Sequence, residues 1–435
     1  MTMSGRTLSR LVASICLTIA FCGSAWAQAD NSFSPYSIFG VGDMAHQGSA
    51  YNQSMAGVGV ALRSNRFINI VNPASVTARD SLAFMADYSM YGDNKVFSQG
   101  GVKSVNNVFN INDLVLSFPL WDHSAMMVGI TPYSSTGFSS SFSYPDGNIG
   151  TISFSADGSG SLYKGFAAAG VTLFKRLSLG AEFDCYFGSV TKTYNTSISD
   201  KSYNSIQNST TLQASALGGK FGLQYEQPIG QKVTLALGAT YSTGADLKGY
   251  YTDERYSVGS VSADTLYYKS DTLGLTRKAK IASELAVGVS FKYADKLMVA
   301  FDYSRSDWTN TGIENISGFS KTSSPFETCL SESYRLGMEF VPNRNDIRYY
   351  FNRVAYRAGA YYKKDYFTCK GQQINSMGLT FGVTLPVFRW YNGLTLGFEL
   401  GQRGALREQL VRERYFNFSI GVNIFDIWFQ KPRYE

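Results

Sequence analysis

The sequence predicts an all-β fold, a transmembrane antiparallel β-barrel of about 14 strands with an N-terminal plug in its lumen. Three observations lead to this prediction. After an export signal, the chain contains no apolar run as long as a membrane-spanning helix. Most of it alternates between apolar residues and small or polar ones, as strands exposed on two different faces do. Short and long connections then alternate between the predicted strands.

The first 27 residues have the three parts of a secretory signal peptide. Arg6 and Arg10 form a positive start, "LVASICLTIAFC" is the apolar centre, and "AWA" is the cleavage site. Lipidation of Cys22 is the competing interpretation, and the bulky Phe21 before it argues against a lipid-attachment motif. We therefore expect export, with the mature chain in a bacterial outer membrane and its insertion dependent on the barrel-assembly machinery.

Composition excludes several classes of function. The net charge of +6 is too mild, and its charges too mixed, for nucleic-acid binding. With only two histidines in the sequence, a His-rich metal site is excluded, and we expect no metal and no cofactor. Cys185, Cys329 and Cys369 follow the signal peptide and are too few for a disulfide framework. One bond between Cys329 and Cys369, at the outer ends of neighbouring hairpins, stays open.

The alternating segments separate a membrane barrel from a soluble β-sandwich. In "RLSLGAEFDCYFG" (176–188), "ELAVGVSFKY" (284–293) and "SMGLTFGVTL" (376–385), one face is aliphatic and aromatic, and the other is mostly Gly, Ser and Thr with scattered charges. The polar face of a sandwich is usually rich in Lys, Glu and Thr. Small residues instead suit the crowded inside of a modest barrel, and the apolar face suits lipid contact.

Strand limits follow from this alternation, and an even strand number places both chain ends on the periplasmic side. The connections near 91–105, 133–157, 196–209, 245–276 and 309–328 are long and polar, and we expect them to be external loops, some with hairpins of their own. We predict strands at 81–90, 106–118, 124–132, 158–174, 177–195, 210–229, 232–244, 277–294, 296–308, 329–342, 351–364, 374–387, 393–404 and 411–429.

Residues 28–80 lack the alternating pattern of a membrane-spanning strand. The predicted barrel comprises residues 81–435. The run "AGVGVA" (56–61) is too apolar for an unstructured tail, so we favour a plug that folds into the lumen. Before Pro73, Asn72 should be extended and cap a short helical turn that begins at Pro73 and contains Ala74. We predict that Asn72, Pro73 and Ala74 form the elbow between plug and barrel.

Catalytic chemistry is not indicated. His46 falls in the predicted plug and His123 in a turn on the periplasmic side, so neither lies on a strand near the outer rim. No phosphate-binding glycine loop precedes a helix. We predict that the protein is not an enzyme.

Charged side chains on the predicted inner face have two interpretations. They either line a polar permeation path, or they form internal ion pairs that hold barrel and plug together, and the mixture of signs favours ion pairing. The residues that represent this predicted network are Asp87, Asp113, Glu182, Glu284, Arg335 and Glu399.

The third predicted strand contains an interruption. Pro132 cannot donate a hydrogen bond to a neighbouring strand, and Gly129 and Gly137 flank it. The simple interpretation is that Pro132 ends the strand at the rim. The alternative is a lateral opening in the barrel wall at Gly129, Pro132 and Gly137.

Several stretches resemble the FadL-type outer-membrane transporters of hydrophobic compounds, in particular the Bacteroidetes branch that includes PorV-like barrels. They are "SMAGVGVAL" (54–62), "NPAS" (72–75), "LTLGFELGQRG" (394–404) and "ERYFNFSIGVNIFDIWFQKPRYE" (413–435). The resemblance covers the whole mature chain. It implies a fourteen-strand barrel, a lumen plug, and lateral exit of an apolar substrate beside a kinked third strand, where Pro132 stands.

Two functions follow from the resemblance. The first is passive transport of hydrophobic small molecules such as long-chain fatty acids, by plug movement and lateral exit, with Tyr133 and Phe138 as guesses for the substrate pocket. The alternative is a non-enzymatic assembly or secretion platform that binds exported proteins or lipid. For either function we expect the barrel to contact outer-membrane lipid, and we expect no nucleic-acid partner.

Overall fold

The structure is a computed structural model. It describes residues 32–80, 82–200, 202–259, 263–316, 326–387, 393–406 and 410–427. The predicted signal peptide and the first residues of the predicted plug lie outside these ranges. Among the described residues, no helix has the length and the apolar character needed to cross a bilayer.

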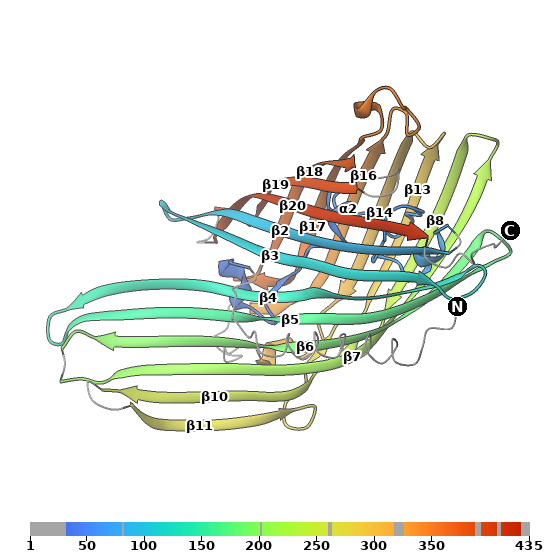
Figure 1. Ribbon diagram of the computed structural model, residues 1–435. Helices are drawn as coiled ribbons and strands as arrows, with labels where there is room; N and C mark the ends of the chain where they lie inside the picture. Colours follow the sequence, from blue (N-terminus) through green and yellow to red (C-terminus); the bar gives the residue numbers. More distant parts are fainter. Residues whose placement is uncertain are drawn as a thin grey trace, which may run out of the picture.

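Fourteen of the eighteen strands in the main sheet close a barrel, as predicted. Each strand pairs antiparallel with its neighbours, and pairing between the first and the last strand closes the ring (Figure 1). Each of the predicted strands overlaps one of these fourteen. The barrel strands are β2 (Ala83–Gln99), β3 (Val102–Pro119), β4 (Ser124–Asp146), β5 (Gly150–Leu173), β6 (Leu177–Ile198), β7 (Ser205–Ile229), β8 (Val233–Ser242), β13 (Glu284–Tyr293), β14 (Leu297–Asp307), β16 (Leu330–Phe340), β17 (Ala355–Cys369), β18 (Gln372–Pro386), β19 (Gly393–Arg403) and β20 (Arg412–Ile427).

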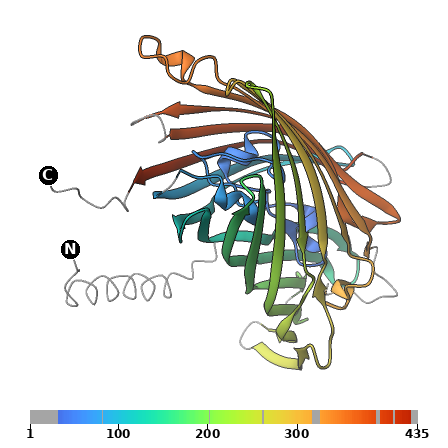
Figure 2. The same cartoon turned by 90° about the vertical axis from the view of Figure 1, so that its right-hand side faces the viewer.

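Short elements complete the described chain. Residues 32–80, which we call the luminal segment, lie inside the ring of strands, as the blue elements of Figure 2 show. They contain η1 (Pro35–Ile38), β1 (Asp43–Met44), α2 (Ala50–Gln53) and η2 (Pro73–Thr77). Outside this segment lie β9 (Ala245–Asp246), β10 (Lys248–Val258), β11 (Ala263–Leu273), β12 (Lys280–Ile281), η3 (Ile313–Ile316), β15 (Phe326–Thr328) and η4 (Tyr350–Asn352).

Four neighbouring strands continue well beyond the ring. β4, β5, β6 and β7 remain paired along residues 134–162 and 188–215, and β10 and β11 add to the outer side of β7. We call this part the extended sheet; Figure 1 shows it reaching away from the barrel. Most of 133–157 and 245–276 is paired as hairpins, which the sequence analysis expected for some of the external loops, but β4 and β5 continue into theirs as unbroken strands. Facing hydroxyls on neighbouring strands bind each other, as Ser143 and Ser153 do, and such cross-strand pairs help these polar stretches to form strands.

The outer face of the barrel is apolar, as lipid contact requires. Leu179, Phe183 and Phe187 on β6 are exposed, with fractions of 38%, 56% and 41%. The largest buried apolar cluster lies elsewhere, between the extended sheet and the luminal segment. It joins Tyr36, Phe39 and other luminal residues to the inner faces of the strands and to Ile313, Phe326 and Phe367.

Cys329 and Cys369 are both free thiols, so the disulfide left open by the sequence does not form. Cys369 lies opposite Phe326 in the ladder of β15 and β17. The thiol of Cys329 instead accepts a hydrogen bond from Gln373 at 3.1 Å. The third free thiol, Cys185, is half-buried on the outer face of β6.

Candidate functional site: the luminal segment and the gap between β3 and β4

One pair of neighbouring barrel strands is joined over only part of its length. β3 and β4 pair from Pro119 opposite Ala125 to Leu114 opposite Ile130, where the described pairing stops. Beyond this point β3 is still paired with β2 and β4 with β5, but the described parts of β3 and β4 no longer pair with each other. The ladder therefore separates at Leu114 and Ile130, and we call the space above these residues the gap.

The luminal segment occupies the inner side of this gap. β1 pairs with the free edge of β4, with Asp43 opposite Ser135 and Met44 opposite Ser134. The next residue, Ala45, donates its backbone N–H to the carbonyl of Tyr133 at 3.0 Å. On the other side, the amide of Asn112 on β3 donates to the carbonyl of Gly48 at 3.2 Å. Residues 43–48 thus bridge β3 and β4 in the region where the two strands no longer pair with each other.

The three residues of the predicted lateral opening all lie on β4, and Pro132 and Gly137 lie beyond its last pair with β3. The register of β4 against β5 shifts between Pro132 and Ser134, which marks a β-bulge two residues beyond the last pair with β3. Gly129 lies within the paired part. At Gly137, an added Cβ would stand 1.7 Å from the carbonyl oxygen of Ser32, so the luminal segment approaches the strand backbone as closely as glycine allows.

His46 projects from the bridging segment toward two carboxylates on different strands. Its Nε2 lies 3.6 Å from Asp93 on β2, and its Nδ1 lies 3.6 Å from Glu399 on β19. Its ring also makes an edge contact with Tyr91, at 5.5 Å between centroids. Burial lowers the pKa of His46, but the charges of Glu399 and Asp93 outweigh burial and raise the pKa above its ordinary value.

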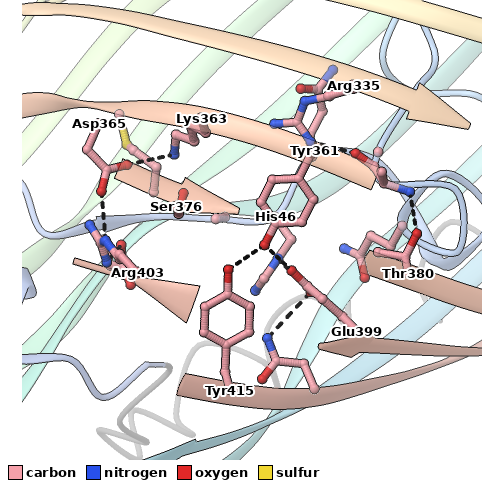
Figure 3. Close-up of a pocket in the computed structure, with 18 of the residues that line it drawn as sticks. His46, Arg335, Tyr361, Lys363, Asp365, Ser376, Thr380, Glu399, Arg403 and Tyr415 are labelled. Atoms are coloured by element: carbon pink, nitrogen blue, oxygen red, sulfur yellow. Dashed lines mark hydrogen bonds and ion pairs between the residues drawn. The ribbon is translucent and has the colours of Figure 1, made fainter. Parts of the chain in front are cut away.

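Asp43, at the start of β1, joins a second set of charges. Arg403 on β19 contacts Asp43 at 2.7 Å and Asp365 on β17 at 2.7 Å (Figure 3). Lys95 on β2 adds a contact of 3.7 Å to Asp43. Burial raises the pKa of Asp43, but Arg403 and Lys95 outweigh burial and hold the pKa below its usual range. Asp43 therefore anchors the segment by charge to two strands, β2 and β19, and Asp365 on β17 holds Arg403 in place.

A cavity of about 100 Å³ lies between part of this segment and the barrel wall. Figure 3 shows Tyr361, Tyr415 and Glu399 converging on it from three strands. The hydroxyls of Tyr361 and Tyr415 lie 2.6 Å apart, and Tyr361 also donates to Glu399. These groups bind one another, which leaves few of them free to bind a ligand.

The small-residue run of the luminal segment is bound along its backbone by the wall. The carboxylate of Asp302 on β14 accepts from the N–H groups of Gly59 at 2.6 Å and Val60 at 2.9 Å. Arg335 on β16 donates to the carbonyl of Ala56 at 2.9 Å. The two glycines of "AGVGVA" have no room for a side chain, because an added Cβ would stand 2.5 Å from Arg335 at Gly57 and 2.5 Å from Val71 at Gly59.

Asn72 and Pro73 lie where the luminal segment turns toward β2. Asn72 is extended, with φ −127° and ψ 117°, and its side chain accepts from the N–H of Ala74 at 3.0 Å. Its amide donates to the carbonyl of Val60 at 2.7 Å and to that of Leu223 on β7 at 3.3 Å. One side chain therefore links the turn, the small-residue run and the barrel wall.

A larger chamber of about 240 Å³ lies above the luminal segment. Tyr133 lines it, with its ring 4.8 Å from that of Tyr186. Phe138, the other guess for the substrate pocket, does not line this chamber and is buried over Gly158. Most of the lining is polar or charged and includes Lys164, Lys220, Asp184, Glu284, Arg335 and Lys363.

The six residues of the predicted lumen network separate into several groups. Asp87 and Asp113 interact with each other on β2 and β3. Glu182 pairs with Lys164 at 2.8 Å. Glu284 and Arg335 line the chamber, whereas Glu399 contacts His46.

Sequence reasoning missed Asp43 of the luminal segment and the wall residues that pair with it, Lys95 and Arg403. Asp302 belongs to the charged residues predicted on the inner face, because it alternates with apolar residues in "MVAFDYS". The partners of Asp43 come from sequence-distant strands, and no local pattern indicates such a pairing. Among the described residues, no group of three or more His, Cys, Asp and Glu side chains is placed to hold a metal ion.

The fold and the site define a class: a fourteen-strand outer-membrane barrel with a segment of its own chain in the lumen. A family profile named BamG matches residues 8–435, and the chain belongs to the BamG family. No curated protein matches the sequence.

Solved structures share this architecture at low sequence identity. The toluene transporter TodX of P. putida superposes with a TM-score of 0.60 at 14% identity, over 89% of this chain and 100% of TodX. A FadL homologue of Pseudomonas aeruginosa gives 0.58 at 12% identity, over 88% and 99%. The toluene transporter TbuX of Ralstonia pickettii gives 0.53 at 17% identity, over 87% and 98%. At these identities the likeness establishes the FadL-type fold.

Proposed function

We propose that the protein is a non-enzymatic outer-membrane channel through which hydrophobic small molecules pass sideways, by way of the gap between β3 and β4. The observation that carries this proposal is the loss of pairing beyond Leu114 and Ile130, with the luminal segment in its place. A break in a barrel wall exposes backbone groups to lipid unless something pairs with them. β1 supplies this pairing on the β4 side, at Ser134 and Ser135, and the side chain of Asn112 on β3 bonds to Gly48. In this proposal, residues 43–48 close the gap from inside and move away to open it.

The chamber behind the gap suggests the character of the substrate. Its lining combines Tyr133, Tyr186 and Trp308 with charged groups such as Lys220 and Arg335. A molecule with an apolar body and one polar end fits this lining better than a pure hydrocarbon, and long-chain fatty acids have this character. Residues 43–48 would withdraw from β4, and the substrate would leave between the strands near Pro132.

A disulfide across β1 and β4 tests whether the bridging segment must move. Met44 and Ser134 lie directly opposite each other, as a cross-strand disulfide requires. We would introduce Met44→Cys and Ser134→Cys after replacing Cys185, Cys329 and Cys369 by Ser. Oxidised cells should take up labelled fatty acid as slowly as a deletion strain, and a reductant should restore uptake. Uptake that equals wild type in the oxidised state would refute movement at this point, and equal uptake by the deletion strain would refute transport.

A second candidate, a platform in the barrel-assembly machinery, is favoured by a different observation. The luminal segment is held by ion pairs and backbone hydrogen bonds to many strands, and the lumen behind it is polar. Such a plug is costly to move, and a barrel with no transport role has no need to move it. The name of the family, BamG, points to the same machinery.

Purification in mild detergent distinguishes the two candidates. A platform should retain barrel-assembly subunits at constant ratio, and depletion of the protein should lower the amounts of unrelated outer-membrane barrels. A channel should be recovered without them, and its depletion should affect uptake alone. The oxidised Met44→Cys, Ser134→Cys variant provides the control, because it should stay fully active as a platform.

A further inference from the structure

The outward face of the extended sheet has an unusual composition. Along β6, the outward residues change from apolar in the barrel to hydroxyl-bearing or amide-bearing above it, and the change falls between Phe187 and Ser189. The same change falls between Tyr163 and Ser161 on β5 and between Leu217 and Ser215 on β7. The rings of Tyr163 and Phe187 stack at 6.2 Å, and aromatic residues of this kind mark the edge of the bilayer.

Above this edge, the face is polar but almost uncharged on β4 to β7, whereas the residues of β10 opposite β7 include Lys248, Tyr250 and Glu254. The outward positions in 139–143, 153–161, 189–197 and 205–215, all of them described, carry one charged side chain, Asp157, which accepts a hydrogen bond from Ser139 at 2.7 Å. We call these positions the hydroxyl face. They are Ser139, Ser141, Ser143, Ser153, Ser155, Asp157, Ser159, Ser161, Ser189, Thr191, Thr193, Asn195, Ser197, Ser205, Gln207, Ser209, Thr211, Gln213 and Ser215. Ser161, next to the bilayer edge, is buried.

The register places these groups in rows across four strands. Thr191 lies opposite Thr211, with their hydroxyls 3.3 Å apart, and Asn195 donates to Ser155 at 3.3 Å. Ser143 and Ser153 lie 2.8 Å apart. Strands repeat about every 4.8 Å and outward residues about every 7 Å, so the hydroxyls form a regular array of donors and acceptors. The apolar cluster on the inner face holds the sheet in shape.

We infer that the hydroxyl face binds neutral sugars of the glycolipid that surrounds the barrel in the outer leaflet. The argument rests on continuity, since the same strand faces contact the lipid tails one residue pair below and therefore meet the saccharide part of the same molecules above. It also rests on chemistry, because sugar hydroxyls both donate and accept, as Ser, Thr, Asn and Gln side chains do.

Two other occupants fit less well. A phosphate or other anion would require cations, and the hydroxyl face carries no Lys or Arg at its described positions. Lys248 on the neighbouring β10 lies opposite Ser215 at the edge of the face, and β10 also carries Glu254, which is unfavourable for an anion. A protein partner would require an apolar centre, since the buried core of an interface is the most apolar part of it. The inference depends on the outer-membrane location alone and holds for either candidate function.

Hydrogen exchange in nanodiscs tests the inference. One preparation contains a lipopolysaccharide with neutral outer sugars, and the other contains lipid A, which lacks them. We expect residues 189–197 and 205–215 of the wild type to exchange several-fold more slowly in the first preparation, and the barrel to exchange equally in both. Equal exchange of these residues in the two preparations would overturn the inference.

Variants assign the effect to the face. Thr193→Glu with Gln213→Glu places two carboxylates in the hydroxyl face. Carboxylates lose their bound water only at high cost, so sugars should no longer bind there, and the difference should disappear. Thr191→Ala with Thr211→Ala removes two hydroxyls without adding charge and should reduce it. The matched control is Ser104→Glu with Asn107→Glu on the exposed β2–β3 hairpin, which should keep the full difference. The heat-dependent mobility of each variant on gels shows whether it is folded. If the difference in exchange between the two nanodisc preparations persists in both face variants, binding at this face is refuted.

Discussion

At the scale of single residues, His46 is placed to make the closure of the gap depend on pH. Its pKa is raised by Glu399 and Asp93, so its protonated form is the one that the folded state favours. The stabilisation is complete below the ordinary pKa of histidine and is lost as the pH rises through the raised value. The other groups that face it are Lys95, whose charge opposes protonation, and Tyr91.

We therefore expect residues 43–48 to exchange amide hydrogens faster as the pH rises from about 6 to about 9, beyond the intrinsic increase in exchange rate. In His46→Gln, exchange corrected for the intrinsic rate should be fast at both pH values. The β19–β20 ladder is the internal reference and should not change. A wild type whose corrected exchange is flat over this range would contradict the role given to His46.

The second prediction at this scale concerns the turn at Asn72 and Pro73. Asn72→Ala removes one acceptor and two donor contacts, which should destabilise the luminal segment by about 1–2 kcal/mol. Pro73→Ala should act in the same direction by loosening the first turn of η2. Both should raise protease sensitivity between residues 56 and 80 and leave barrel melting unchanged. Asn148→Ala, in the exposed β4–β5 turn, is the control.

At the scale of elements, the N-terminal part of the luminal segment adds to the edge of β4, and Gly137 makes this possible. Gly137→Ala places a Cβ 1.7 Å from the carbonyl oxygen of Ser32, so residues 32–34 must leave the strand. The backbone bond from Ser34 to Gly137 and the side-chain bond from Ser34 to Glu413 should then break. Crosslinking from a probe at Ser34 to β4 would report the loss. Gly147→Ala, where an added Cβ meets no atom within 4 Å, should change nothing.

The elements also explain how far the sequence could be read. Alternation in segments such as 176–188 depends only on strand geometry and lipid contact, so the barrel strands were predictable. The extended sheet was not, because its inner face packs against the luminal segment and against Trp308, Ile313 and Phe326, far away in sequence. The contacts of Asp43 and His46 were hidden for the same reason. Pro132 and Asn72 were identifiable because proline restricts the backbone locally.

At the scale of the whole molecule, the barrel and the luminal segment are held by different forces. The ring is closed by backbone pairing from β2 to β20, and none of those pairs involves residues 32–80. The luminal segment is held by buried charges such as Asp302 and Arg403 and by the apolar cluster around Phe39. The two parts should therefore be separable.

Deletion of residues 32–71 tests this separation. The charges on the inner wall would lose their partners, but water would fill the emptied lumen and hydrate them, so the cost is smaller than for charges left in a dry interior. We expect a variant that still folds, melts at a lower temperature than wild type, and conducts ions steadily in planar bilayers. Wild type should conduct little, because residues 43–62 fill the lumen and bridge the gap. A variant that cannot fold would show instead that the luminal segment is part of the barrel core, and that a closed gap is its permanent state.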